Sequence, residues 1–171
     1  MNKSMLYQDI YNRIQKKRAI WFEPSDLCLK EISDYISNSS KEMVIEWSLL
    51  QVKRIIDTLK QKYPEEDRAV LAYERSIQWL HKQIKMPMVK HAILDCHAVV
   101  NDITSPSDKA LFHAVGQGLS TIHVKTHAMG IPIYELTSIV RTHIDDFECE
   151  VNQKIKDYLN AFDFIQSKNA H

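Results

Sequence analysis

Residues 39–62 read SSKEMVIEWSLLQVKRIIDTLKQK and contain the clearest structural pattern of the chain. Ser39, with Glu42 three residues later, has the form of a capping box, which predicts that a helix begins here. The apolar side chains that follow form one broad stripe along such a helix, at Val44, Trp47, Leu50, Val52, Ile55, Ile56 and Leu59. A stripe of this width needs other elements to cover it, so the segment predicts one helix of a packed bundle.

Composition points to the same fold class. Glycine occurs only 3 times in 171 residues, which is too rare for the tight turns that connect β-hairpins. Hydrophobic residues make up 44% and charged residues 26% of the chain, as in an ordinary globular domain. We therefore expect an all-α, single-domain bundle of about six or seven antiparallel helices.

Prolines and capping residues divide the rest of the chain. Further helices are expected at residues 2–19, 25–37, 64–85, 87–103 and 105–130, the last one beginning after Ser105 and ending at Gly130. Apolar residues from Pro132 onward alternate spacings of three and four, which predicts a long C-terminal helix with a kink allowed near Asp145-Asp146. The expected division is an N-terminal helical extension (1–40), a helical core (41–130) and this long C-terminal helix (131–166).

Charge and hydropathy narrow the function classes. Lys plus Arg and Asp plus Glu are equal at 22 each, so no global positive field favours nucleic acid. The stretch 1–21 lacks the apolar core of a signal peptide, and no stretch approaches the roughly 20 apolar residues of a membrane span. We expect a cytoplasmic protein that binds neither nucleic acid nor a membrane.

The stretch HAVGQGLSTIHVKTHAMG at residues 113–130 holds three of the eight histidines. His123 and His127 are four residues apart, so on one helix they would share a face and could hold a metal ion. No HExxH or further ligand accompanies them, and hydrogen-bonded structural histidines with no cofactor are the preferred interpretation. If a hairpin turns near Thr104-Ser105, positions that sum to about 210 face each other, which places His97 near His113.

Gly116 and Gly118 fall inside the helix expected at 105–130, where each costs about 1 kcal/mol relative to alanine. This cost indicates the close approach of a neighbouring helix. Cys28, Cys96 and Cys149 are widely spaced and are interpreted as free thiols. Because no nucleophile motif or catalytic constellation is found, we expect a protein that is not an enzyme.

An acidic patch is expected in the middle of the long C-terminal helix. Its members are Asp145, Asp146, Glu148 and Glu150. Such a patch is either solvated or a surface that covers a basic partner.

The 113–130 stretch and the following IPIYEL resemble the AxGQAxATAHVxxHALGAAxYAL signature of immunity proteins in bacterial polymorphic toxin systems. The stretch EWSLLQVKRIIDTLKQKYPEEDRAVLAYERSIQWL is similar to a paired-helix segment of that family, and the resemblance covers about residues 44–140. The matching motif residues are His113, Gly116, Gln117, His123, His127 and Gly130. Departures from small alanine-like residues occur at Gly118, Leu119, Ser120 and Ile122.

The resemblance implies a bacterial immunity protein that neutralises a cognate toxin by binding it, with motif residues that serve the structure or contact the partner. Two other interpretations stay open. One is a metal-binding helical-bundle enzyme that uses His123 and His127. The other is a helical scaffold or regulatory protein that self-associates, for example as a homodimer.

Overall fold

The computed structural model describes residues 5–169, and every regular element in this part is helical. Its α-helices are α1 (Gln8–Gln15), α2 (Lys30–Asn38), α3 (Lys41–Lys62), α4 (Arg68–Leu80), α5 (Met86–Ala98), α6 (Pro106–Ser120), α7 (Gly130–Thr142) and α8 (Phe147–Asn169). Short 3-10 helices are η1 (Met5–Tyr7), η2 (Leu27–Leu29), η3 (Val99–Asn101) and η4 (Lys125–Met129). The prediction of an all-α domain is confirmed. No helix of this part combines the length and the apolar character that crossing a membrane requires.

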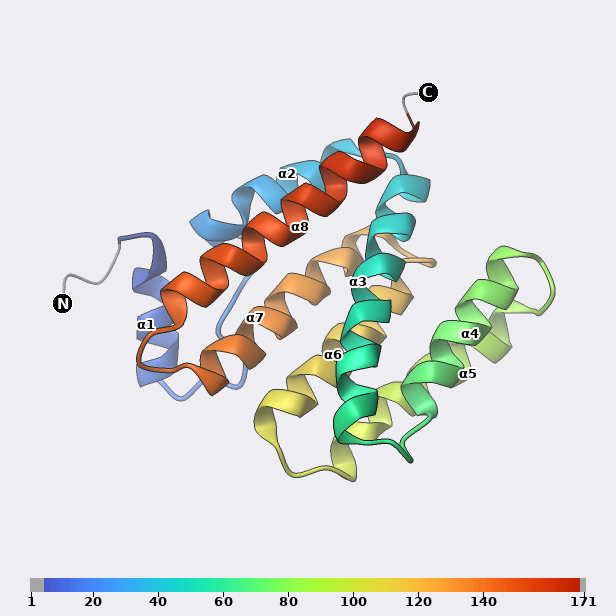
Figure 1. Cartoon of the computed structure of the whole chain (residues 1–171), viewed down its shortest axis with the longest axis horizontal. Coiled ribbons are helices and arrows are strands. Elements are labelled where there is room, and N and C mark those ends of the chain that lie inside the picture. Colours follow the sequence, from blue (N-terminus) through green and yellow to red (C-terminus); the bar gives the residue numbers. More distant parts are fainter. Residues whose placement is uncertain (1–4, 170–171) are drawn as a thin grey trace.

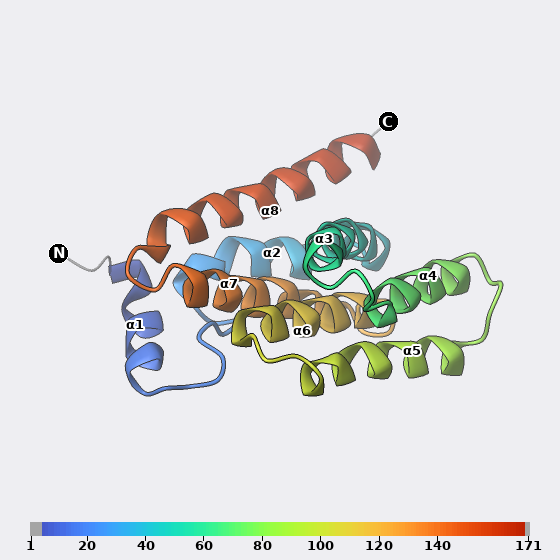
Figure 2. The ribbon, with the colours of Figure 1, turned by 60° about the horizontal axis from the view of Figure 1, so that its bottom comes forward.

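Helices α6 and α7 lie side by side at the centre of the molecule (Figure 1). Helix α3 packs against α6, and the hairpin of α4 and α5 packs against α6 at one end. Helix α8 covers α7, α3 and α2 on the other side, while α1 lies at the end opposite the hairpin (Figure 2). The central pair is therefore surrounded by helices from both halves of the chain.

The contact between α3 and α8 is built on aromatic rings. Trp47 is fully buried, and its indole N–H donates to the carbonyl oxygen of Tyr158 at 3.1 Å. Its ring stacks on Phe162, with the ring centroids 4.4 Å apart. A large ring whose single polar group is satisfied is a favourable core residue, so Trp47 anchors the stripe predicted for residues 39–62.

The prediction of a single long C-terminal helix is wrong, because the chain forms two helices there. Helix α7 ends at Thr142 and α8 begins at Phe147, so the kink allowed near Asp145-Asp146 is a complete break. Phe147 is fully buried, and its ring centroid lies 5.7 Å from that of Tyr7 and 5.1 Å from that of Tyr11. Folding back lets α8 bury its apolar side on α7 and α3, which a straight helix would leave in solvent.

The helix expected at 105–130 is also interrupted. Ser105 is its N-cap as predicted, accepting a hydrogen bond from the backbone N–H of Asp108, but α6 ends at Ser120. Thr121 is fully buried, and its hydroxyl lies 3.2 Å from that of Ser48 on α3. Gly130 does not end a helix: it is the first residue of α7 and has an ordinary helical φ of −62°.

Several other helix boundaries differ from the prediction. The cap of α3 is Ser40 and not Ser39, since the side chain of Ser40 accepts from the backbone N–H of Met43 at 3.2 Å. Helix α1 ends at Gln15 and not at residue 19, and Lys17 then takes a φ of 51°. Residues 2–4 of the helix expected at 2–19 lie outside the described part of the chain. Residues 64–67 are not helical, because α4 begins only at Arg68. The helix expected at 25–37 begins with the 3-10 helix η2.

Candidate functional site

The motif residues of α6 pack against α5 as the hairpin rule predicts. The Nδ1 atoms of His97 and His113 are 3.4 Å apart, and their ring centroids are separated by 5.7 Å. The ring of His113 lies 5.1 Å from that of Tyr134 on α7. His113 therefore sits between two helices, in contact with a ring on each of them.

Three glycines occupy positions where no side chain fits. A Cβ on Gly116 would lie 2.3 Å from the imidazole carbon Cε1 of His97, and one on Gly118 would lie 2.4 Å from Cγ2 of Val52. A Cβ on Gly130 would lie 2.4 Å from that of Gln117. The close approach predicted for Gly116 and Gly118 is confirmed, and it explains why glycine occurs inside a helix despite its cost.

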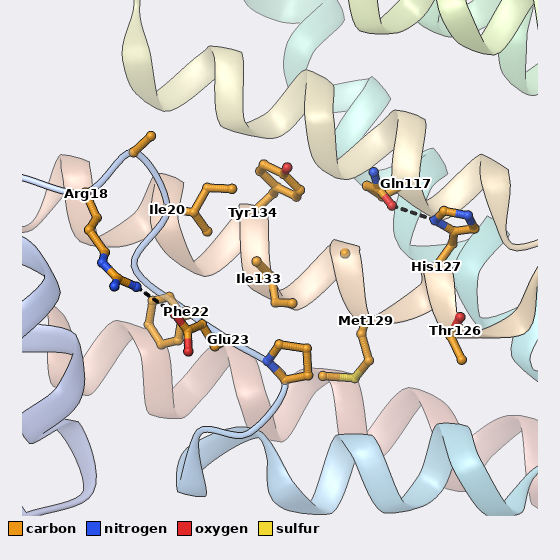
Figure 3. A pocket seen from close by; sticks show the side chains of 13 residues that line it. Arg18, Ile20, Phe22, Glu23, Gln117, Thr126, His127, Met129, Ile133 and Tyr134 are labelled. Atoms are coloured by element: carbon orange, nitrogen blue, oxygen red, sulfur yellow. Dashed lines mark hydrogen bonds and ion pairs between the residues drawn. The ribbon is translucent and has the colours of Figure 1, made fainter.

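Gln117 connects two motif positions. Its side-chain oxygen lies 2.8 Å from Nδ1 of His127, and its Cβ is packed on Gly130 (Figure 3). An amide oxygen only accepts hydrogen bonds, so Nδ1 of a neutral His127 carries the hydrogen and Nε2 is left as an acceptor. The pair ties the end of α6 to η4 and the start of α7.

His123 and His127 do not share a helix face. His123 lies in the turn after α6 and His127 lies in η4, so the helical four-residue geometry behind the metal interpretation is absent. Among the described residues, Nε2 of His123 is buried with no hydrogen-bond partner. Residues 5–169 also contain no group of three or more His, Cys, Asp or Glu placed to hold a metal ion.

A surface groove lies directly over these motif residues. Its larger hollow has a volume of about 610 Å³ and is open to solvent between the segment 18–24 and the elements α6, η4 and α7 (Figure 3). Its lining residues are Arg18, Ala19, Ile20, Phe22, Glu23, Pro24, Gln117, Thr126, His127, Met129, Gly130, Ile133 and Tyr134. A smaller hollow of about 250 Å³ shares three of them and is lined by Ala19, Ile20, Pro106, Lys109, Ala110, His113, Tyr134 and Arg141. The two hollows together are called the motif groove below.

The segment 18–24 is held in place by contacts from several elements. The backbone N–H of Trp21 donates to the Thr137 hydroxyl at 3.3 Å, and Arg13 donates to the Trp21 carbonyl at 2.9 Å. Arg141 on α7 donates to the carbonyl of Ala19 at 2.6 Å, and Phe22 is buried. The wall is therefore held on α7 and α1 by contacts within the chain itself.

The two hollows differ in charge. In the larger one Arg18 donates to Glu23 at 2.9 Å, so the charges cancel. The smaller one contains Lys109 and Arg141 and no carboxylate among its lining residues. Within the described chain neither cation makes a salt bridge, and Arg141 donates only to the carbonyls of Ala19 and Pro106. Burial lowers the pKa of Arg141 from its ordinary value.

One protein family matches residues 34–161, described as the Imm-5 like putative immunity protein family. The chain belongs to this family. The match extends beyond residues 44–140, the range that the signature resemblance covers, and includes α7 and most of α8. No curated protein and no solved structure matches the chain significantly. Of the two walls of the motif groove, the one on α6, η4 and α7 lies inside the Imm-5 like match and the segment 18–24 lies outside it.

Burial changes the pKa values of two histidines of this Imm-5 like chain. It lowers the pKa of His97, with the charges of His113 and His127 adding to the effect. It also lowers the pKa of His113, where the charge of Arg141 contributes. Near neutral pH both rings are therefore neutral, which is compatible with the short distance between their Nδ1 atoms.

The cysteines are free thiols in different environments. Cys28 and Cys96 are buried and Cys149 is exposed. Burial raises the pKa of Cys28 and that of Cys96 to about 12. At neutral pH the two buried sulfurs are almost entirely protonated and are weak nucleophiles.

The predicted acidic patch is only partly a free surface. Asp145 and Asp146 lie in the exposed turn between α7 and α8, and Glu150 is exposed on α8. Glu148 accepts a hydrogen bond from the Tyr11 hydroxyl at 2.9 Å, so it also holds α1. None of the four lines either hollow of the motif groove.

Sequence reasoning found the motif side of the groove and missed the other side. The sequence pattern predicts that residues 18–19 end a helix and places the whole segment 18–24 in the N-terminal extension, and it gives no reason to single out Tyr134 or Arg141. The one available signal was the pair Glu23-Pro24, which marks a break in the helical pattern. Nothing in the local pattern indicates that this break faces α7, more than 100 residues further along the chain.

Proposed function

We propose that this protein is an immunity protein that binds a cognate protein toxin and thereby blocks its activity. The observation that carries the proposal is the family match over residues 34–161. The motif residues of the family region support a rigid scaffold, because Gly116 packs directly on His97 and Gly130 packs directly on Gln117. A rigid scaffold lowers the entropy cost of binding, which favours tight association with one partner.

Binding, rather than chemistry, is the proposed mode of action. The buried thiol of Cys96 is protonated at neutral pH, and Nδ1 of His127 is already engaged by Gln117. The metal-dependent alternative relied on His123 and His127 sharing one helix face, and the turn after α6 separates them. A toxin-binding protein instead needs a complementary surface, of which a stable complex buries about 1,200–2,000 Å² in total. The motif groove would be part of such a surface.

The test is co-expression with the product of the adjacent gene, followed by tag pull-down and a count of surviving cells. We expect a stoichiometric complex and restored growth. The negative control is the Trp47→Ala variant, which removes the main aromatic contact of α3 with α8. We expect this variant to lose its fold, as measured by circular dichroism, and with it the ability to restore growth. A well-folded wild-type chain that neither binds the neighbouring product nor restores growth would contradict the proposed function.

A further inference from the structure

The smaller hollow of the motif groove contains an excess of positive charge that the chain itself does not neutralise. Two half-buried arginines elsewhere have carboxylate partners: Arg13 pairs with Asp26 at 2.7 Å and Arg68 with Glu66 at 2.6 Å. The half-buried Arg75 donates instead to the side-chain amide oxygen of Gln78 at 3.0 Å. The hydrogen bonds donated to these carboxylates raise the pKa of Arg13 and of Arg68, whereas burial lowers the pKa of Arg141. Arg141 is thus a partly desolvated cation whose hydrogen-bond acceptors in the described chain are two backbone carbonyl oxygens.

The guanidinium of Arg141 has N–H donors that no acceptor in the described chain uses. It carries five N–H groups, and the carbonyls of Pro106 and Ala19 accept from two of its nitrogens. Its central carbon also lies over the Trp21 ring, 5.4 Å from the ring centre, which adds a cation–π contact to the two hydrogen bonds. An arginine held in this way is preorganised to bind a carboxylate in a charge-assisted hydrogen bond.

Lys109 adds a second cation to the same hollow. It lies four residues before His113 on α6, so both side chains project from one face of the helix. No salt bridge of Lys109 occurs within the described chain. A carboxylate placed between Lys109 and Arg141 would meet two positive charges and no negative one from the lining residues.

The larger hollow, in contrast, is suited to an apolar side chain. Ile20, Phe22, Met129 and Ile133 line it, and Figure 3 shows Ile133 and Met129 on the side opposite the segment 18–24. Methionine is flexible and adapts its shape to a partner. Because the two hollows share Ala19, Ile20 and Tyr134, one continuous occupant can reach both.

We propose that the motif groove is the docking site for an acidic segment of the protein partner, with one carboxylate bound by Arg141 and Lys109 and a neighbouring apolar side chain in the larger hollow. The proposal rests on the proposed function and identifies the surface that performs it. Charge complementarity selects this occupant: two cations beside an apolar hollow match a carboxylate next to an aliphatic or aromatic residue. A nucleic-acid backbone would need a longer track of cations than one arginine and one lysine.

The wall formed by residues 18–24 lies outside the family match, while the opposite wall on α6, η4 and α7 lies inside it. The family match therefore covers only one side of the motif groove.

The experiment measures the affinity of the complex between the full chain and the toxin. Lys109→Glu reverses the charge of a side chain that forms no side-chain hydrogen bond in the described chain. We expect this variant to raise the dissociation constant of the complex by at least about tenfold. Lys156→Glu on α8 is the matched control, because it changes the net charge equally on an exposed side chain outside the groove, and it should stay within about twofold of wild type. Wild-type affinity should also fall with added salt more steeply than that of Lys109→Glu.

A second pair of variants separates charge from folding. Arg141→Lys keeps the charge and Arg141→Gln removes it, so affinity should decrease in the order wild type, Lys, Gln. Where Arg141→Gln lowers the melting temperature strongly, the conclusion is drawn from Lys109→Glu, whose fold is expected to be intact.

The outcomes are distinguishable. If the wild-type chain neither binds nor rescues, the proposed function fails and the docking proposal falls with it. If the wild type binds and rescues while Lys109→Glu and Arg141→Gln bind equally well, only the docking proposal is overturned. The same holds if native mass spectrometry finds a small carboxylate in the groove, or if light scattering shows a dimer that Lys109→Glu dissociates, since the occupant is then a metabolite or a second copy.

Discussion

Helix α7 carries two charged side chains with opposite environments. Glu135 is buried, and it accepts hydrogen bonds from Arg54 at 2.6 Å and from the Tyr158 hydroxyl at 2.6 Å. Arg141, less than two turns further on, has no carboxylate partner within the described chain and opens onto the motif groove. A buried charge that is fully paired serves the fold, whereas a half-buried charge that lacks a counter-ion is available to a partner.

The paired side of α7 should show the largest effect on stability. Replacing Glu135 by alanine removes the acceptor of both Arg54 and the buried Tyr158 hydroxyl, whose pKa burial and Glu135 raise. We expect the free energy of unfolding to fall by about 3 kcal/mol, since a buried pair that loses one partner leaves the other unsatisfied. Urea denaturation measures this, with the exposed Glu74→Ala on α4 as control.

A loss below about 1 kcal/mol for Glu135→Ala would show that the cluster is not structural, and the contrast with Arg141 would disappear.

A methyl group at Gly116 tests the packed face of α6 behind the groove. The new Cβ would overlap the His97 ring, at 2.3 Å from one of its carbons, so the ring must move. We expect Gly116→Ala to cost about 1–2 kcal/mol, because overpacking outweighs the gain in helix propensity. The double variant with His97→Ala should recover part of the loss in a thermal unfolding series, and strictly additive values would contradict direct contact.

Removing the charge of Arg141 should affect stability less than removing that of Glu135. Arg141→Gln loses two hydrogen bonds to exposed carbonyls but also removes an unpaired, partly desolvated charge, so we expect a cost of about 1 kcal/mol or less. The measurement is the same urea denaturation used for Glu135→Ala. Equal costs at the two positions would mean that Arg141 mainly holds the segment 18–24 and would weaken its assignment to binding.

The smallest effect concerns pH and the histidines between α5 and α6. Burial lowers the folded-state pKa of His97 and His113 below the value of about 6.5 expected in the unfolded chain. As the pH falls below about 6.5, the unfolded state takes up protons first, so stability decreases through the window down to the folded pKa values and is unaffected above it. Unfolding measured from pH 7.5 to pH 5 should show this decrease.

His97→Gln should reduce that decrease, and His81→Gln, at the exposed position directly after α4, is the matched control. A stability that stays constant or rises as the pH falls would contradict the burial of the two rings.

The prediction from sequence was most accurate where the information is local. The apolar stripe of residues 39–62 identified α3, and the hairpin rule placed His97 opposite His113 because residues near one turn face each other by simple counting. Gly116 and Gly118 indicated the close approach of neighbouring side chains, because the cost of a glycine inside a helix must be offset by packing. It failed at boundaries such as residues 121–124 and 143–146, where local apolar spacing continues but the chain turns to bury Ile122 and Phe147.

What the sequence by itself determined is the all-α class, the positions of most helices, the α5–α6 pairing and the family to which the motif belongs. Each of these follows from side chains a few positions apart or from a recognisable order of residues. Only the tertiary structure decided that α8 folds back over α7, that Glu135 is paired while Arg141 is not, and that residues 18–24 form the second wall of the groove. The physical reason is that these contacts join residues up to 122 positions apart, and burial and charge compensation across such separations depend on the whole packed chain.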